Sequence, residues 1–337
     1  MTAAVIFGIS GTTLSPDEIE LFSEVDPYGF ILFTRNLESA KQIKRLIGEL
    51  EETVGRSRLP ILIDQEGGRV ARLKPPLCPV YPPAQKFADM FKHAKQRAER
   101  ACYLNARLIA HDLYDLGITV NCAPVADLPV AGAHDVIGDR AFGHAPEQVI
   151  ALARAQVKGF MDGGIVPVLK HIPGHGRAKA DSHHELPVVD ASLDLLRKTD
   201  FVPFKALNDL PMAMTAHVLY PAIDKEKMAT ISPAAIRIIR EEIGFKGLLM
   251  SDDIYMKAMK GNFTQRAKDV LSAGCDIVLH GNGLHYNFAE MQEAVEGVTE
   301  LSGASLIRAK AAMDAVNAPQ VFDVAAMRKE LAQLMGM

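Results

Sequence analysis

One pattern recurs along this chain: a short, continuous apolar run, then a polar loop, then a segment with helical periodicity. Apolar runs of this kind are typical of parallel β-strands that are covered on both faces. Eight such units favour a (β/α)8 barrel, and a doubly wound open sheet is the alternative. The predicted strands are Ala3–Gly8, Gly29–Phe33, Leu59–Ile63, Thr119–Ala123, Val166–Leu169, Met212–Thr215, Leu248–Met250 and Asp276–Leu279.

The segments between these runs carry start and stop signals of helices. Ser232-Pro233, for example, opens one predicted helix and Gly244 closes it. No Gly-x-Gly-x-x-Gly fingerprint follows an early strand, which disfavours the doubly wound alternative. We therefore expect a single α/β barrel domain over residues 1–337, with a helical extension from about residue 290. The predicted helices include Glu38–Val54, Phe87–Leu116, Pro146–Gly163, Ser192–Leu207, Pro233–Ile243 and Phe263–Ala273.

Composition excludes several classes of protein. Hydrophobic residues make up 48% of the chain and charged residues 23%, which excludes wholesale disorder, collagen and coiled coil. The net charge of −4 gives no general field that would attract nucleic acid or anionic lipid. No apolar run reaches the roughly 18 residues of a membrane span, and the N-terminus lacks the basic region of a signal peptide. We expect no nucleic-acid or membrane partner.

Cysteine usage bears on the compartment. The chain has four cysteines without any Cys-x-x-Cys spacing, and three of them lie in apolar surroundings. Buried free thiols are therefore expected, rather than disulfides or zinc ligands, and they suit a reducing compartment. We expect a cytoplasmic monomer. The four cysteines are Cys78, Cys102, Cys122 and Cys275.

Charged and imidazole groups follow most of the predicted strands. The active site of a (β/α)8 barrel is built at the C-terminal ends of its strands, and a purely structural barrel needs no such groups there. Burying them unpaired would cost several kcal/mol each, so their convergence indicates an enzyme. They lie in Asp64–Arg69, Ala123–Asp127, Lys170–Gly176, at His217, in Ser251–Asp253 and in His280-Gly281-Asn282.

Several of these residues also have structural interpretations. Neighbouring strand residues point in opposite directions, so only one of Asp252 and Asp253 is expected to face the barrel centre, and the other could cap the next helix. Lys170 could simply pair with a carboxylate at the rim, and His217 could be a satisfied core histidine. His175 could do no more than brace its loop.

A polar loop over residues 176–187 holds Asp181 and His183, two positions apart. A carboxylate beside an imidazole fixes its tautomer and raises its basicity, and such a pair can donate and later accept a proton near neutral pH. The residues alone leave two alternatives open. His184 next door could be the active imidazole, and the loop could be merely solvated.

Four motifs resemble those of glycoside hydrolase family 3, and more narrowly its bacterial cytoplasmic β-N-acetylglucosaminidases of cell-wall recycling. They occur in the family's order and extend from the third to the seventh predicted strand, and Val136–Gly143 is also similar. The resemblance implies a (β/α)8 domain, in agreement with the strand pattern. The motifs are Asp64-Gln65-Glu66-Gly67-Gly68-Arg69-Val70, Lys170-His171-Ile172-Pro173-Gly174-His175-Gly176, Asp181-Ser182-His183 and Ser251-Asp252-Asp253.

The resemblance implies a retaining exo-β-N-acetylglucosaminidase. Its substrate would be a small carbohydrate, a muropeptide with terminal N-acetylglucosamine on anhydro-N-acetylmuramic acid or a chitobiose-like sugar, and no cofactor or metal is expected. Asp252 would be the nucleophile and His183 the general acid/base, with Asp181 as its partner. The positions that match sugar-binding residues are Asp64, Arg72, Arg140, Lys170 and His171.

Other activities remain open from sequence. An N-acetylglucosaminide phosphorylase fits because a histidine acid/base does not repel phosphate, and a family 3 β-glycosidase with another sugar specificity fits the same motifs. Substrate-assisted chemistry on Asp252-Asp253, a Schiff-base aldolase using Lys170 and a non-catalytic sugar-binding protein are further alternatives. The family usually has a small residue three positions after the nucleophile, where this chain has Tyr255. A metal-dependent hydrolase would use His171, His175, His183 and His217.

Overall fold

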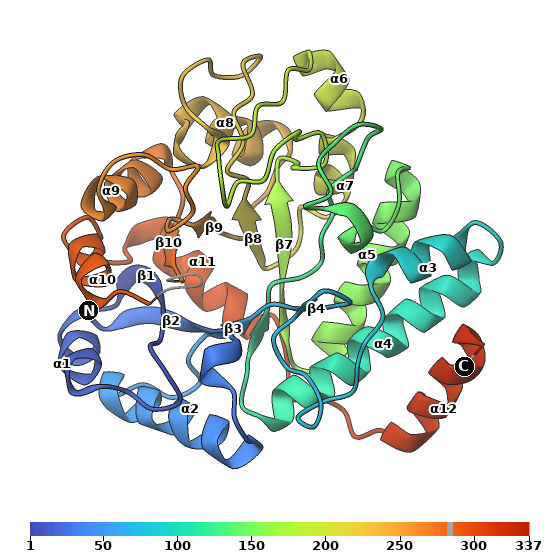
Figure 1. Cartoon of the computed structure of the whole chain (residues 1–337), viewed down its shortest axis with the longest axis horizontal. Coiled ribbons are helices and arrows are strands. Elements are labelled where there is room, and N and C mark those ends of the chain that lie inside the picture. Colours follow the sequence, from blue (N-terminus) through green and yellow to red (C-terminus); the bar gives the residue numbers. More distant parts are fainter. Residues whose placement is uncertain (282–285, 337) are drawn as a thin grey trace.

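Eight parallel strands form a closed barrel (Figure 1) in the computed structural model, which describes residues 1–281 and 286–336. The strands follow one another around the barrel in chain order, and the last pairs with the first. The predicted (β/α)8 barrel is confirmed, although Asn282 of the eighth strand-end motif lies outside the described residues. The barrel strands are β1 (Ala3–Gly8), β2 (Pro27–Leu32), β3 (Ile61–Ile63), β6 (Val120–Asn121), β7 (Val166–Ile172), β8 (Met212–Thr215), β9 (Leu248–Asp253) and β10 (Ile277–His280).

Helices surround the barrel, and two predicted helices are divided. A third, Pro233–Ile243, is α-helical only to Arg237 and continues as a π-helix over Ile238–Glu242. The predicted helix Phe87–Leu116 is two helices joined by a turn at residues 92–94. Ser192–Leu207 also divides, at Thr199 and Asp200, because the ring of Pro203 would clash with the carbonyl of Thr199 in one continuous helix. The helices are α1 (Pro16–Val25), α2 (Ala40–Val54), α3 (Ala84–Phe91), α4 (Lys95–Asp115), α5 (Pro146–Asp162), α6 (Leu193–Lys198), α7 (Phe201–Ala206), α8 (Pro233–Arg237), α9 (Phe263–Ala273), α10 (Phe288–Val295), α11 (Gly303–Asp314) and α12 (Val324–Met335).

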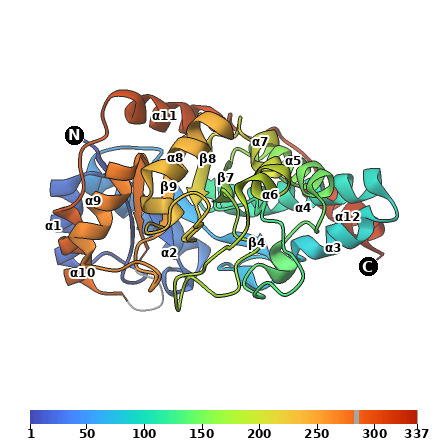
Figure 2. The same cartoon turned by 90° about the horizontal axis from the view of Figure 1, so that it is seen from above.

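Two large buried apolar clusters make up most of the core. One lies between the strands and the surrounding helices, and the other draws residues from all eight strands and fills the barrel interior. Ala309 and Ala312 of α11 belong to the interior cluster, and Tyr28 donates a hydrogen bond to the carbonyl of Ala309 at 3.0 Å. Figure 2 shows α11 on the side of the molecule opposite β4 (Gln65–Gly67). Helix α11 therefore closes the end of the barrel at which the strands begin.

All four cysteines are buried and free, as the sequence predicts. Burial raises the pKa of the Cys102 thiol, which keeps it protonated and unreactive near neutral pH. None of the described helices is both long and apolar enough to cross a lipid bilayer.

Candidate active site

Strand alternation places three of the predicted site residues inside the mouth of the barrel. Successive strand residues face opposite sides, so a residue two positions beyond an interior residue also faces the interior. Three interior apolar residues are each followed, two positions later, by a charged residue at or just beyond the C-terminal end of the same strand. These pairs are Leu62 and Asp64 at β3, Val168 and Lys170 on β7, and Met250 and Asp252 on β9.

The same alternation separates Asp252 from Asp253. Leu249, which has the parity of Asp253, belongs to the outer cluster, and Oδ1 of Asp253 accepts backbone hydrogen bonds from Tyr255 and Gly281 at 3.0 Å each. Neither aspartate caps the next helix, because Asn262 is the N-cap of α9; that alternative is wrong. Burial raises the pKa of Asp252, but nearby imidazoles and a backbone hydrogen bond outweigh burial and lower it overall. Asp252 is thus an ionised carboxylate in the mouth.

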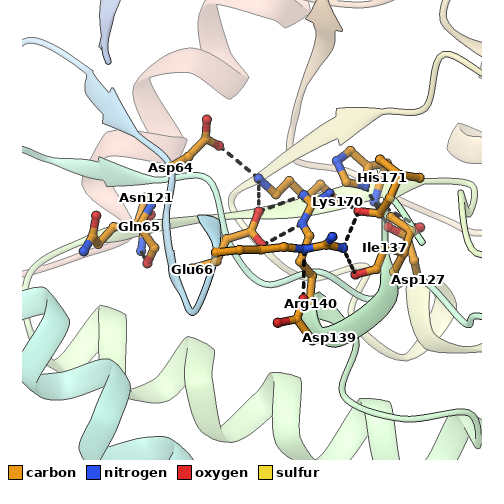
Figure 3. A network of polar contacts seen from close by, with 12 residues as sticks. Asp64, Gln65, Glu66, Asn121, Asp127, Ile137, Asp139, Arg140, Lys170 and His171 are labelled. Atoms are coloured by element: carbon orange, nitrogen blue, oxygen red, sulfur yellow. Dashed lines mark hydrogen bonds and ion pairs between the residues drawn. The ribbon is translucent and has the colours of Figure 1, made fainter. Parts of the chain in front are cut away.

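Five charged residues form one connected group beside Asp252, which we call the charge network: Asp64, Glu66, Arg72, Arg140 and Lys170. Lys170 Nζ lies 3.0 Å from Asp64 Oδ1 and 2.7 Å from Glu66 Oε1. Arg140 donates two hydrogen bonds to Glu66, from Nε to Oε2 at 2.9 Å and from Nη2 to Oε1 at 2.8 Å. Arg72 Nη2 donates to Asp64 Oδ2 at 2.8 Å. Figure 3 shows Glu66 between Lys170 and Arg140. The network contains four of the predicted sugar-binding residues, and its fifth member, Glu66, was not predicted to bind the sugar.

The charge network stays ionised because its charges are paired. Burial raises the pKa of Glu66, but Arg140 and Lys170 outweigh burial and lower it to about 2. Burial lowers the pKa of Lys170, but Asp64 and Glu66 outweigh it and raise the pKa above its usual value. An ammonium has three N–H donors, and Lys170 uses two of them on these carboxylates. Among the described residues the third has no partner, so it can bind a hydroxyl group.

A short hairpin holds Asp64 and Glu66 in place. Strand β4 pairs antiparallel with β5 (Val70–Ala71), and the Gln65 side chain accepts the backbone N–H of Arg72 at 2.9 Å. The Asn121 side chain bonds both backbone groups of Gln65 at 3.0 Å each. Gly67 has a φ of +98°, and a Cβ there would lie 2.4 Å from the Pro82 carbonyl oxygen, so no other residue fits.

The loop over residues 176–187 carries the predicted acid/base pair. His183 Nδ1 lies 2.7 Å from Asp181 Oδ1, which also accepts the His183 backbone N–H at 2.9 Å. The His183 side chain is 58% exposed. Ser182 is buried between them, and its carbonyl accepts the N–H of Ala258, in the segment that follows Asp252. The loop is thus attached to the segment behind β9, and the His183 imidazole is close enough to Asp252 to contribute to lowering its pKa.

Comparisons with known proteins identify the family of the chain. The model of the glycosyl hydrolase family 3 N-terminal domain matches residues 15–313. The chain belongs to glycosyl hydrolase family 3. It is 39% identical over 280 residues to a beta-hexosaminidase of Alkalilimnicola ehrlichii, covering 82% of this chain and 79% of that protein. A beta-hexosaminidase of Idiomarina loihiensis is 35% identical over 280 residues, with 82% and 83% covered.

Solved structures of family 3 are similar over almost the whole chain. NagZ from Neisseria gonorrhoeae, crystallised in complex with N-trifluoroacetyl-D-glucosamine, superposes with a TM-score of 0.87 at 32% identity. The match covers 99% of this chain and 97% of that one. The predicted family, and with it the prediction of a glycoside hydrolase, is confirmed.

The candidate site histidines of this family 3 domain differ in their hydrogen-bond partners. His217 is fully buried, with Nδ1 2.7 Å from Thr230 Oγ1 and Nε2 3.1 Å from the carbonyl oxygen of Asp253, so its structural interpretation is confirmed. His171 and His175 both bond Asp127, whereas His183 bonds Asp181. Within residues 1–281 and 286–336, no group of three or more His, Cys, Asp or Glu side chains is arranged to hold a metal ion.

Glu66 and Asp127 lie in segments that the sequence places at the barrel mouth, but no role was predicted for either residue. Glu66 lies two positions after Asp64 in the same motif, and Asp127 ends the polar segment after the fourth predicted strand. Each is nearly or fully buried and bonds residues predicted to bind the sugar. A carboxylate in such a segment is therefore a candidate for holding another site residue in position.

Proposed function

We propose that this family 3 enzyme is a retaining exo-β-N-acetylglucosaminidase with Asp252 as its nucleophile. The observation that carries the proposal is the ionised Asp252 carboxylate, which faces the interior of the barrel mouth together with Asp64 and Lys170 and interacts electrostatically with His183. Relatives named beta-hexosaminidase, and a NagZ structure with an N-acylated glucosamine, support the choice of sugar.

The proposed reaction has two displacements at the anomeric carbon. Asp252 attacks that carbon and forms a covalent glycosyl-enzyme, while His183 gives its proton to the departing glycosidic oxygen. His183 then removes a proton from water, the water oxygen attacks the same carbon, and Asp252 leaves as a carboxylate. The two inversions give net retention.

Asp181 prepares His183 for both proton transfers. Burial raises the pKa of Asp181, but hydrogen bonds from the backbone and ring of His183 outweigh burial and lower it overall. The ionised carboxylate can only accept hydrogen bonds, so His183 keeps a proton on Nδ1 and exchanges the other through Nε2.

The charge network supplies the sugar-binding groups of this proposal. Asp64 accepts hydrogen bonds from sugar hydroxyls, and Lys170, Arg72 and Arg140 donate them. Charge-assisted bonds of this kind contribute about 1.5–3 kcal/mol each. Because the network is already paired without the sugar, its donors need little reorganisation when the transition state forms.

We propose peptidoglycan fragments as the substrates, with N-acetylglucosamine at the non-reducing end and a muramic-acid derivative as the leaving group. The motif resemblance to the cell-wall-recycling branch of the family supports this choice. Recycling would place the enzyme in the cytoplasm, a reducing compartment in which its four free, buried thiols stay reduced.

The test is hydrolysis of an aryl N-acetyl-β-glucosaminide by the wild type and by Asp252→Asn, which conserves shape but cannot attack. Turnover should fall by about 10⁴-fold or more while the melting temperature stays close to that of the wild type. Asp89→Asn, a change at an exposed aspartate on α3, is the control and should keep full activity. Near-normal turnover by Asp252→Asn would end the proposal.

Two product measurements separate the alternatives. A fluorinated substrate analogue should leave a glycosyl adduct on Asp252, detected by mass spectrometry, whereas substrate-assisted chemistry leaves none. Free N-acetylglucosamine should be the product with and without phosphate, because a phosphorylase would release the sugar phosphate. A matching aryl β-glucoside should be a poor substrate; preference for it would indicate a different sugar specificity.

A further inference from the structure

Asp127 lies beyond the C-terminal end of β6 and contacts both ends of the turn that follows Lys170. The residue is fully buried. Its Oδ2 lies 2.7 Å from His171 Nδ1, and its Oδ1 accepts the backbone N–H of His175 at 2.6 Å. The His171 backbone N–H also points at both carboxylate oxygens, at 3.3 and 3.4 Å. Figure 3 shows His171 above Asp127, next to Lys170 and the charge network.

The Asp127 carboxylate determines which nitrogen of His171 carries the proton. Burial raises the pKa of Asp127, but the imidazole of His171 and the surrounding hydrogen bonds outweigh burial and lower it overall. An ionised carboxylate only accepts hydrogen bonds, so Nδ1 of His171 must donate. In the neutral ring, Nε2 then has a lone pair, and it makes no hydrogen bond to any residue in the described part of the chain.

The surroundings of His171 make an acceptor useful. Lys170, Arg72 and Arg140 are donors, whereas each Asp64 oxygen already accepts one hydrogen bond from a cation, so Asp64 has only part of its acceptor capacity left for the sugar. A sugar hydroxyl that accepts a hydrogen bond from one of these cations still has its own proton to donate. A neutral Nε2 at the barrel mouth can take that proton in a hydrogen bond.

Other charged groups also face this pair. The His175 ring lies 5.7 Å from the His171 ring, and burial lowers the pKa of His175 to about 4, so His175 stays neutral near pH 7. Asp252 and Arg140 are close enough to interact electrostatically with His171 and Asp127, respectively. Asp127 is the described carboxylate bonded directly to the His171 ring.

We propose that Asp127 is a positioning residue that fixes the tautomer of His171, so that Nε2 accepts a hydrogen bond from a hydroxyl of the bound sugar. The proposal rests on the sugar-binding function proposed above. It goes beyond that function by assigning a role to a buried residue outside the sugar contacts, and by giving His171 the role of acceptor. A donor-only role for His171, like that of Lys170, would be incompatible with it.

Direct observation of the tautomer is the first test. Long-range ¹⁵N–¹H spectra of histidine-labelled wild-type protein, assigned with His171→Gln and recorded where the ring is neutral, should show His171 protonated on Nδ1. In Asp127→Asn the amide can donate to Nδ1, and the proton should move to Nε2. An Nε2-protonated ring in the wild type would overturn the proposal, even if no Asp127 variant folds.

Kinetics is the second test, with a matched control. Asp127→Asn should lower kcat/KM for an aryl N-acetyl-β-glucosaminide by about 10–100-fold. Asp200→Asn changes another buried carboxylate, which packs against Gly174 of the same turn but bonds Arg177 and Thr199 instead of a site histidine. This control should lose comparable thermal stability and keep kcat/KM within about threefold. Equal kinetic losses in both variants would show that Asp127 is merely structural.

A double-mutant cycle connects the two residues. If Asp127 acts through His171, adding Asp127→Asn to His171→Gln should change kcat/KM little further, whereas independent roles would give multiplicative losses. A wild type without hexosaminidase activity would refute the proposed function, whereas the tautomer experiment would still decide the role of Asp127.

Discussion

The charge network and the 176–187 loop carry different parts of the proposed chemistry, and they are built in opposite ways. Lys170 and Glu66 have side chains only 3% and 7% exposed, and each is bonded to more than one partner. His183 is 58% exposed and is bonded to a residue two positions away. The network depends on the whole barrel, whereas the acid/base pair is local.

This difference corresponds to what each part must do. Donors that hold one sugar ring work best when fixed before the sugar arrives, since ordering them later would weaken binding. An acid/base that first meets a leaving group and then a water molecule needs access to both, and exposure on a loop provides that access. Damage to the network should therefore affect folding and binding together, whereas damage to the loop should affect catalysis alone.

The largest effect is expected for Lys170→Met. The change leaves Asp64 and Glu66 facing each other without their shared cation, and removing one partner of a buried ion pair costs about 3–5 kcal/mol. Urea denaturation should show that loss together with the loss of hydrolysis. Lys158→Met, which removes a 67%-exposed lysine paired with Asp162, should cost less than about 1 kcal/mol. Similar losses in both variants would contradict the contrast between the two regions.

His183→Ala should give the complementary result. Unfolding free energy should change by less than about 0.5 kcal/mol because the side chain is exposed. The kcat/KM for a substrate with an unactivated leaving group should fall about 10²–10⁴-fold, and less for a nitrophenyl leaving group, which needs little protonation. His184→Ala, at the exposed neighbouring histidine, is the matched control and should stay near the wild type. If His184→Ala has the larger effect, the two imidazoles have been assigned in the wrong order.

The pH dependence of stability should also differ between buried and exposed histidines. Both ring nitrogens of His280 are buried and have no hydrogen-bond partner among residues 1–281 and 286–336, and burial lowers the pKa of His280 to about 4. The unfolded chain, with a histidine pKa near 6.5, binds this proton first, so stability is lost as pH falls from about 6.5 to about 4. At pH 5 the loss due to His280 is about 2 kcal/mol.

His280→Leu should remove that part of the acid sensitivity. Urea denaturation at pH 7.5 and pH 5 measures it, and the difference in unfolding free energy between the two pH values should shrink by about 2 kcal/mol relative to the wild type. His93→Leu, at an exposed histidine, should keep the wild-type difference. An unchanged difference in His280→Leu would mean that the buried ring is protonated at no cost.

Much of the barrel and part of the site could be predicted from the sequence because they depend on local pattern. Alternation within a strand fixes which residue faces the interior, so Met250 and Asp252 share a side however the rest of the chain folds. Asp181 and His183 are close because they are only two positions apart in the sequence. The division at Thr199 was also available, since Pro203 lies four positions later.

The pairings between distant segments could not be predicted in the same way. Glu66 and Arg140 are 74 positions apart, and their contact depends on how the β4–β5 hairpin meets the short turn Gly138–Arg140. Asp127 and His171 are 44 positions apart, on neighbouring strand ends. Several carboxylates and several cations converge on the same rim of the barrel. Sequence periodicity does not indicate which carboxylate pairs with which cation there.

Tyr255 belongs to neither region, and its replacement should have the smallest effect. Its ring stacks on Phe263 with centroids 6.2 Å apart and planes 16° apart, and its backbone N–H bonds Asp253. Because serine keeps the backbone bond and loses only the ring, Tyr255→Ser should cost about 0.5–1.5 kcal/mol of unfolding free energy. The kcat/KM for an aryl N-acetyl-β-glucosaminide should change no more than about threefold.

A double-mutant cycle distinguishes this packing role from a role in substrate selection. Phe263→Leu should cost a similar amount of stability, and adding Tyr255→Ser to it should cost less than the two separate losses together, because the stacked pair is already gone. A fall in kcat/KM of about tenfold or more with unchanged stability would instead place the Tyr255 ring against the leaving group. In that case the segment behind Asp252 would belong to the substrate site. The site would then have three regions: the fixed sugar site, the local acid/base loop and a segment that determines specificity.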